Sequence, residues 1–548
     1  MKRGFTLIEL LAVIVILAII SLIAVPIVIN IISDAKKSSQ EESFNLYAKA
    51  IENGVVTYLL KHPTVNPETL TMEDIKDYVK YSGEKTDCEI LQIGTKGNIY
   101  LSDCKVDNTK VEYEYGNLIK PIVSLTQGLT PVIYDEANEK WIVVDKNDPN
   151  WYDYDEQKWA NAIVLGTDVT KQVGDEVKVD GTEAKMMLVY IPRYEYKIEG
   201  QFGKGGRRAD LPGEIEVNFI GKNKTKATEG YHINNAFNFD GAKSGFWVGK
   251  FEISHETLSS NKTSNNLRCS TTSCTNASGL RILPNKESLR YNNVSNFWYA
   301  IKSIENTSSF GLTNMDTHMM KNSEWGAVAY LSQSKYGKYG NNDYIGFEKE
   351  IYINNSTYYY TGRSGGNVGG KAKYPKKPYT NSDKCYYGFY TYDGYLLDFN
   401  KNNKTEEKII NKGTGASTTG NIYGVYDMSG GAWEYVMGAY GTSTPKINDS
   451  GFGSTVFTGN TIESKYYDIY KTNNVSTACD NNGPCLGHAM SETASWYRDY
   501  AYMVSSSYPW FLRGGYCYSN HLAGVFFCNN AIGNSDFPSS ARVVVFEK

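Results

Sequence analysis

The run from Phe5 to Ile32 is almost entirely apolar and contains a single charged residue, Glu9. A bilayer crossing needs about 20 consecutive apolar residues, so this run is long enough to span a membrane as a helix. A cleaved secretory signal would have a shorter apolar core followed by a small-residue cleavage site, and neither feature is present. The sequence therefore predicts a membrane-spanning helix over residues 5–35.

Lys2 and Arg3 form a short basic head, and Gly4 directly precedes Phe5 at the start of the apolar run. A carboxylate such as that of Glu9 is expensive in hydrocarbon and is usually functional there. This pattern resembles the class III signal of type IV prepilins and pseudopilins. The resemblance implies cleavage after Gly4, methylation of Phe5 as the new N-terminus, and a role for Glu9 in pilus assembly, where it neutralises the amine of a neighbouring subunit. The alternative is a plain membrane anchor with an accidental glutamate.

The same resemblance implies where the chain goes and what it meets. Residues 1–4 would be the leader and residues 5–35 the stem helix, which packs with other stems in the core of a fibre. The implied partners are prepilin peptidase, the pilus-assembly machinery and other pilin subunits. The implied location is the bacterial cell membrane, through a single N-terminal span, and then the cell surface as part of a pilus or pseudopilus.

After the apolar run, apolar residues recur at helical spacing, so the helix is expected to continue as an amphipathic half. It should end near His62-Pro63, because proline restricts the residue before it. Thr71 can cap a short helix that reaches Tyr81. We therefore predict a small α/β globule of pilin type over residues 36–110.

Nine cysteines are present, and an odd number leaves at least one of them unpaired within the chain. Six of them form three pairs that are close in sequence and flanked by turn residues. Such pairs indicate local disulfides and an oxidising, exported location, although free thiols are the alternative. The paired C-x-x-C spacing of a zinc site is absent. The candidate disulfides join Cys88 to Cys104, Cys269 to Cys274, and Cys479 to Cys485.

With 548 residues the chain is longer than one domain, and its net charge of -4 gives no electrostatic basis for binding nucleic acid. Residues 111–180 alternate strand-like runs with Asp, Asn and Pro turns, which indicates a β-rich connector. The acidic segment 148–156 lacks the spacing of an EF-hand. We expect that segment to be a solvated loop rather than a calcium site.

From residue 181 onward, four patterns are separated by long polar segments. Residues 187–192 and 245–252 are typical of strands, and residues 320–331 are typical of a helix that Ser323 could cap. The fourth pattern is G-V-Y-D-M-S-G-G-A-W-E-Y at 424–435. In this order the four patterns resemble the formylglycine-generating-enzyme type of C-type-lectin-like fold, in which loops carry the ligand-binding residues. The predicted fold class is therefore α+β: a pilin helix and globule, then a large, loop-rich, lectin-like domain over residues 181–548.

The resemblance extends to the fold but not to the family's catalytic groups. Its oxidases need two closely spaced cysteines in the final segment as copper ligands, and here Cys517 and Cys528 lie there without that spacing. Its sulfoxide-synthase relatives need three histidines, and the six histidines form no such cluster. Gly431 stands where the family usually has Asn, which counts against a structural calcium ion. We predict a non-enzymatic binding domain without metal or cofactor, and bound calcium is the open alternative.

The tail from Gly514 to Ser540 contains no Lys, Glu, Gln, Met or Trp. Its aromatic residues alternate with small polar ones, as in an antibody loop, and the alternative is an ordinary surface loop. The order R-G-G, A-G-V-F and R-V-V-V resembles the variable region of proteins targeted by diversity-generating retroelements. In that family, error-prone copying turns AAY codons into NNY codons, which cannot encode the five missing residues.

This resemblance divides the tail into scaffold and recognition face. The final apolar run, 543–546, is typical of a buried strand. Aromatic anchors among adaptable polar residues suit binding to a protein or a glycan. The expected scaffold is Trp325, Asp427, Gly430, Trp433, Arg513, Gly514, Gly515 and Arg542. The expected ligand-binding residues are Tyr516, Cys517, Tyr518, Ser519, Asn520, His521, Phe527, Asn529, Asn530, Asn534, Asp536, Phe537 and Ser539.

Three functions follow from these patterns. The leading hypothesis is a surface-displayed, ligand-binding pilin or pseudopilin whose segment 512–546 is diversified by a retroelement and binds a ligand on a cell, a host or a phage. The alternative is a pilus-tip adhesin, or minor pilin, of fixed specificity. The remote alternative is an oxidase of the formylglycine-generating type. A purely structural major pilin is disfavoured, because so large a head would crowd a helical fibre.

Overall fold

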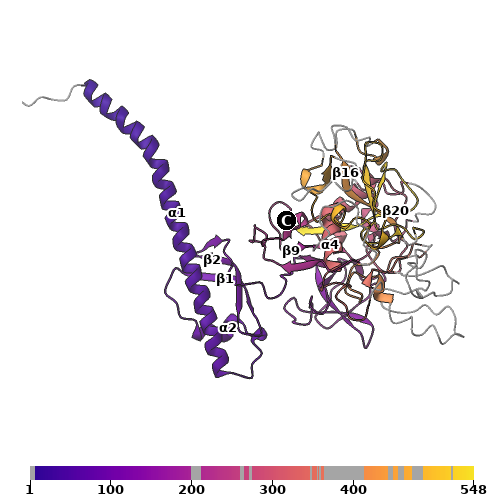
Figure 1. Cartoon of the computed structure of the whole chain (residues 1–548), viewed down its shortest axis with the longest axis horizontal. Helices are drawn as coiled ribbons and strands as arrows, with labels where there is room; N and C mark the ends of the chain where they lie inside the picture. Colours follow the sequence, from indigo (N-terminus) through magenta and orange to yellow (C-terminus); the bar gives the residue numbers. More distant parts are fainter. Residues whose placement is uncertain are drawn as a thin grey trace, which may run out of the picture. The chain divides into compact units, whose positions relative to one another are not determined.

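Two compact units make up the chain, Met1–Lys120 and Pro121–Lys548 (Figure 1). A long N-terminal helix is followed by a large unit made mostly of strands, so the fold class is α+β. The computed structural model describes residues 7–198, 212–258, 265–270, 274–345, 349–354, 356, 359–362, 413–441, 448–453, 462–471, 485–519 and 522–548.

The first unit begins with α1 (Leu7–Lys61), a helix of 55 residues with Pro26 inside it. As predicted, the helix ends directly before His62-Pro63. Within the described residues, no helix combines the length and apolar character that crossing a membrane requires. Of the predicted processing and assembly residues, Gly4 and Phe5 lie outside the described part of the chain, whereas Glu9 lies within α1.

The second half of α1 packs against a small antiparallel sheet with the strand order β1-β2-β3 (Figure 1). Phe44, Ala48, Ile51 and Val55 are buried there, and their spacing of three or four residues places them on one face of the helix. The amphipathic continuation is therefore confirmed. The strands are β1 (Thr86–Ile93), β2 (Ile99–Val106) and β3 (Thr109–Val111).

A short helical segment lies between α1 and β1. It consists of η1 (Pro67–Thr69), α2 (Met72–Ile75) and η2 (Lys76–Tyr78), so it stops at Tyr78 rather than at the predicted Tyr81. The backbone N–H of Thr71 donates to Asp74 Oδ2 at 2.8 Å, which satisfies one of the free amides at the helix start.

Two disulfides lie within the described residues. Cys88 and Cys104 sit opposite each other on β1 and β2 and are bonded across the hairpin, and Cys269 is bonded to Cys274. Cys485 is also disulfide-bonded, and its expected partner Cys479 lies outside the described residues. Two of the three pairs indicated by spacing are thus present as bonds, and both close short loops.

The second unit is built on an eight-stranded antiparallel sheet with the order β15-β21-β12-β8-β6-β4-β5-β7. The last strand of the chain, β21, therefore lies inside the sheet between β15 and β12. The strands are β4 (Thr130–Asp135), β5 (Lys140–Val143), β6 (Asn161–Leu165), β7 (Glu176–Val177), β8 (Ala184–Pro192), β12 (Gly245–Gly249), β15 (Met315–Met319) and β21 (Val543–Glu547).

The predicted C-terminal core strand is confirmed. Val543, Val544, Val545 and Phe546 are at most 1% exposed. The Phe546 ring stacks on Phe239 with the ring centres 4.5 Å apart. Such complete burial explains why this strand is apolar throughout rather than alternating.

Four strands of the segment predicted as a connector, residues 111–180, belong to the large sheet. The runs predicted as strands are β4, β5 and β6, and β6 pairs directly with β8. Trp151 and Trp159 of this segment are buried in the same core. The boundary between the units therefore lies at Lys120–Pro121, and residues 121–180 are part of the large unit instead of a separate connector.

The helix predicted over residues 320–331 is α4 (Asn322–Ser332), and all its residues are buried. Ser323 does not cap it, contrary to the prediction, because Lys321 is the capping residue. Glu324 Oε2 accepts the Lys321 backbone N–H at 2.8 Å, and the Ser323 backbone N–H donates to Asp468 Oδ2 at 2.8 Å. A carboxylate from another segment thus replaces the local serine at the helix start.

Smaller sheets and one further helix cover the large sheet. One small sheet has the order β10-β9-β11, a second joins β13 to β14, and a third has the order β17-β16-β18-β19 with β20 paired to β16. These elements are α3 (Val294–Lys302), β9 (Tyr194–Lys197), β10 (Glu216–Phe219), β11 (His232–Ile233), β13 (Ser254–His255), β14 (Leu280–Arg281), β16 (Trp433–Tyr440), β17 (Asp468–Tyr470), β18 (Trp510–Arg513), β19 (Cys528–Ala531) and β20 (Ser539–Ala541).

A buried ion pair joins β16 to the start of the C-terminal strand. Arg542 and Glu434 are both fully buried, and Arg542 Nε donates to Glu434 Oε2 at 2.9 Å while a second nitrogen contacts the other carboxylate oxygen. Burial raises the pKa of Glu434 to about 7 and that of Asp427 to about 6. Burial and these two neighbouring carboxyl groups also raise the pKa of Glu252. Arg542 is therefore the cation that offsets this group of acids.

Replacing Arg542 with Met should destabilise the second unit by about 3–5 kcal/mol, because it leaves buried acids without their cation. All nine tryptophans lie after residue 140, so tryptophan fluorescence during urea unfolding reports on this unit alone. The exposed Arg268→Met is the matched control and should change the unfolding free energy by less than about 0.5 kcal/mol. Equal stability of the two variants would contradict the role given to Arg542.

Candidate ligand-binding face

The tail returns twice to β16. β18 pairs with β16 in antiparallel fashion, with Arg513 opposite Glu434, and β20 pairs with β16 in parallel, with Ser539 opposite Trp433. β19 then pairs with β18. The tail is thus held at three places by backbone ladders.

Beneath the surface, the R-G-G motif is rigid. Arg513 is fully buried, and its Nη2 donates to the Ala489 carbonyl oxygen at 2.9 Å. Gly514 and Gly515 have φ of +80° and +75°, which L side chains rarely adopt. A Cβ on Gly515 would also come within 2.6 Å of the Ala523 Cβ. Glycine is therefore required where the A-G-V-F segment crosses over the motif.

Above this scaffold, aromatic side chains reach the surface. Tyr518 and Phe537 are 56% and 42% exposed. The Tyr516 ring lies 4.5 Å from Trp433 and 5.8 Å from Tyr518, so these three rings form one cluster. We call Trp433, Tyr516, Tyr518, Phe537 and Tyr291 the aromatic face.

Phe537 belongs to a second ring cluster. Its ring contacts Tyr359 at 5.7 Å and Tyr291 at 6.2 Å, and the Arg290 guanidinium lies 4.4 Å from the Phe537 ring centre. The two clusters meet at Cys517. Cys517 packs with Tyr359 of the second cluster, and Tyr516 of the first cluster packs against these buried residues. Rigid rings held by neighbouring rings lose little side-chain freedom on binding, which suits a recognition surface.

Three residues predicted on the exposed face are buried. Cys517, Phe527 and Ser539 are only 4%, 3% and 0% exposed. The Cys517 backbone N–H donates to the Gly431 carbonyl oxygen at 3.0 Å, and Ser539 lies in β20, so backbone pairing draws both inward. These three residues are part of the scaffold rather than of the recognition face.

Five polar members of the predicted set are half-buried. Asn530 Nδ2 donates to the Met503 carbonyl oxygen at 2.6 Å, so this amide holds the backbone instead of pointing freely to solvent. Asn520 and His521 lie outside the described residues. The half-buried polar residues are Ser519, Asn529, Asn530, Asn534 and Asp536.

Trp433 has a different place from the one expected. It was predicted as scaffold, but it is half-buried and its ring contacts that of Tyr516 at an interplanar angle of 55° in the aromatic face. Its indole Nε1 makes no hydrogen bond to any described residue. The other predicted scaffold residues are buried, namely Trp325, Asp427, Gly430, Arg513, Gly514, Gly515 and Arg542.

Two exposed tyrosines were not among the predicted ligand-binding residues, because they precede the tail. Tyr500 and Tyr502 are 37% and 56% exposed, and their rings are stacked at 5.5 Å. Backbone hydrogen bonds tie both residues to Cys528 of β19. Their alternation, Tyr-x-Tyr, is typical of an extended segment with both rings on one side, and it could have identified them.

The two tail thiols do not form a metal-binding or redox pair. Cys517 packs with Tyr359 and Ala432, whereas Cys528 belongs to the main core. Burial raises the pKa of Cys517 to about 11 and also raises that of Cys528, so both remain protonated at neutral pH. In the described part of the chain, no three His, Cys, Asp or Glu residues gather to hold a metal ion. The two thiols do not fit the copper site of the formylglycine-generating oxidases.

Gly431 does not leave room for the asparagine that the family has there. Its φ is +73°, and a Cβ would come within 2.5 Å of Glu252 Oε1. The Glu252 carboxylate already accepts the Ala432 backbone N–H at 2.8 Å. Residue 431 thus lies in a turn that the Glu252 carboxylate holds through Ala432.

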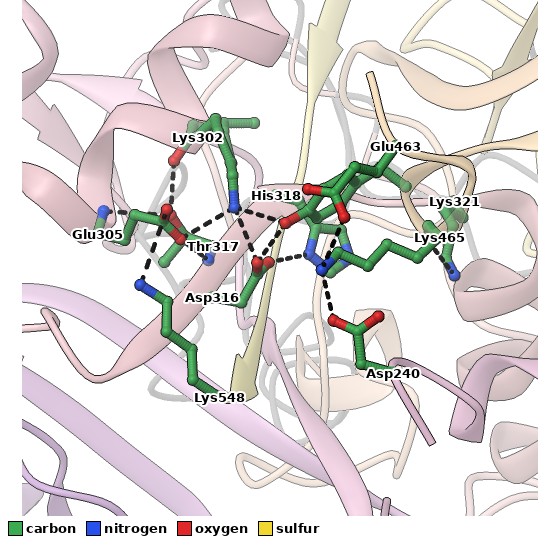
Figure 2. A network of polar contacts seen from close by, with 12 residues as sticks. Asp240, Lys302, Glu305, Asp316, Thr317, His318, Lys321, Glu463, Lys465 and Lys548 are labelled. Atoms are coloured by element: carbon green, nitrogen blue, oxygen red, sulfur yellow. Dashed lines mark hydrogen bonds and ion pairs between the residues drawn. The ribbon is translucent and has the colours of Figure 1, made fainter. Parts of the chain in front are cut away.

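A network of ion pairs surrounds His318, which is fully buried (Figure 2). Its Nδ1 lies 2.9 Å from Asp316 Oδ1 and its Nε2 lies 3.0 Å from Glu324 Oε1. Burial alone would lower the pKa of His318, but the two carboxylates raise it overall. Lys302 completes the network through Asp316 Oδ2 at 2.8 Å. We interpret this network as a structural connection between β15, α3 and α4, which sequence spacing alone did not reveal.

Glu492 supports the segment behind Arg513. Its carboxylate accepts hydrogen bonds from the hydroxyls of Tyr196 and Tyr330, each at 2.8 Å, and from the Gly487 backbone N–H at 2.6 Å. It is buried without a cation among these partners. Burial raises its pKa to about 7.

Because the folded state holds the Glu492 proton more tightly than the unfolded state does, this group stabilises the fold below about pH 4.5, and the effect is lost as the pH rises through 7. In the wild type, this group should lower the unfolding free energy by up to about 3 kcal/mol as the pH rises from about 4.5 through 7. Glu492→Gln should abolish that fall. Urea unfolding at a series of pH values measures this. Exposed Glu136→Gln is the control, and an unchanged pH profile in Glu492→Gln would contradict the assignment.

Residues 1–25 match the prokaryotic N-terminal methylation motif. No curated protein matches the chain. The match implies processing by prepilin peptidase and assembly with other pilins, and it indicates insertion in a membrane followed by display on a pilus. The N-terminus of this chain is therefore of the type IV prepilin kind.

Proposed function

We propose that this chain is a surface-displayed pilin or pseudopilin whose large unit binds a ligand through the aromatic face. The prepilin-like N-terminus supports display, and the exposed rings support binding, since Tyr, Trp and Phe dominate binding surfaces. The large unit is proposed to have the lectin-like fold of the formylglycine-generating-enzyme type, in line with the order of its sequence patterns.

The observation that carries the proposal is the division of the tail into two layers. Arg513, Gly514, Gly515 and Arg542 are buried and fixed by backbone geometry, whereas Tyr518 and Phe537 above them are exposed. Side chains in the upper layer can change without altering the lower one. This division is what a diversified recognition surface requires, and we propose that a retroelement rewrites codons within segment 512–546.

We further propose that the large unit is not an enzyme. The buried, protonated thiols of Cys517 and Cys528 are poor nucleophiles and poor metal ligands. The alternative function is a pilus-tip adhesin of fixed specificity, which the same aromatic face would serve. The two functions differ in whether the exposed positions vary between cells.

Deep sequencing of codons 511–546 and the flanking DNA, across many cells of one population, tests the diversification. We expect substitutions at codons of exposed and half-buried residues such as Tyr518 and Phe537, and a near-identical template repeat nearby. Codons for the buried Cys517, Phe527 and Ser539 should vary less, because they serve packing. A uniform tail without a template would leave the fixed adhesin as the function.

The two layers should also differ in tolerance to substitution. Tyr518→Asn should change the unfolding free energy by less than about 1 kcal/mol, because the side chain is more than half exposed. Phe527→Asn should destabilise the large unit by at least about 3 kcal/mol, because it removes a buried ring and buries an amide. Urea unfolding followed by tryptophan fluorescence measures both. Similar losses in the two variants would argue against a separable recognition layer.

A further inference from the structure

A cleft of about 690 Å³ lies on the large unit, and none of its lining residues belongs to the tail. Its walls come from three parts of the chain: Arg193 at the end of β8, the segment from Thr225 to Ala242 that includes β11, and Leu486. The volume falls within the range of about 300–1,000 Å³ that small-molecule sites occupy. Neither the pilin-type N-terminus nor the aromatic face accounts for it.

The walls of this cleft are tied together by buried polar side chains. Arg193 donates to the carbonyl oxygens of Phe237 at 3.2 Å and Lys224 at 3.1 Å. Asn234 Nδ2 donates to the Gly487 carbonyl oxygen at 3.0 Å, which fixes the Leu486 wall to β11. The cleft is therefore preformed, so a ligand would not have to order it.

The walls are polar, and among their described lining residues only Arg193 is permanently charged and is just 5% exposed. The lining includes three asparagines, a threonine, a tyrosine and a histidine, but no Asp, Glu or Lys. The guanidinium of Arg193 already binds backbone carbonyls. Burial lowers the pKa of His232, so its imidazole is neutral at neutral pH. A cationic ligand would find no carboxylate on these walls, and an anionic ligand would meet only the buried guanidinium of Arg193, which already donates to two carbonyl oxygens.

Amide and hydroxyl groups both donate and accept hydrogen bonds, as do the hydroxyl groups of a sugar. Thr225 and Asn238 are exposed at the cleft and can provide such bonds, and the rings of Tyr231 and His232 offer apolar surface beside them. Apolar lining residues are limited to Ala227, Ile233, Ala242 and Leu486, which form no pocket for a large apolar anchor of a protein partner. We propose that this cleft binds an uncharged oligosaccharide.

Titration calorimetry of the full chain tests this, in a detergent without a sugar headgroup. The probes are uncharged hexasaccharides of glucose, mannose, galactose and N-acetylglucosamine, with a sulfated hexasaccharide as the charged comparison. We expect saturable binding of at least one uncharged probe and none of the sulfated one. Binding to none of the uncharged probes, or to the sulfated probe alone, would overturn the proposal.

Variants locate the site. Asn238→Trp and Thr225→Trp place a bulky ring at the cleft and should each weaken binding at least tenfold. Because both positions are exposed, the fold should tolerate them, and exposed Asn314→Trp is the matched control. Tyr518→Ala, on the aromatic face, should leave oligosaccharide affinity unchanged. Wild-type affinity in both cleft variants, or loss of affinity in Tyr518→Ala alone, would show that the cleft is not the site.

Discussion

The pairing of Arg542 with Glu434 is the interaction on which the large unit depends. Arg542 stands at the start of β21, and Glu434 lies on β16, the strand that carries both returning segments of the tail. The pair therefore links the eight-stranded sheet to the sheet beneath the aromatic face. A buried ion pair stabilises a fold little by itself, but it strongly disfavours other arrangements, because each charge needs its partner.

Apolar patterns in the sequence predicted much of the framework. The amphipathic half of α1, helix α4 and strand β21 all follow from periodicity or from continuous apolar runs. The boundary between the units was harder to predict, because strands β4 to β7 pair locally with one another and join the rest of the large sheet only through β6, which pairs with β8. Periodicity identifies a strand without naming its partner.

Buried polar groups were the least predictable part. Nothing in the sequence shows that Asp316, His318 and Glu324 meet, because they join a strand to a helix start. The recognition face was predicted in outline from composition, yet Cys517, Phe527 and Ser539 lie below it. A two-residue alternation cannot tell inside from outside in a segment without regular strands. Trp433 was assigned to the scaffold from the resemblance of the 424–435 pattern, which does not show that this ring lies half-buried at the surface.

The position of β21 also has a consequence for biosynthesis. β21 lies between β15 and β12, so the central sheet has a gap until this strand has been made. The large unit can therefore complete its core only after residues 543–547 have been translated. A premature stop or a frameshift anywhere in the tail removes this strand. Each copy with a complete central sheet has therefore been translated in frame at least as far as β21.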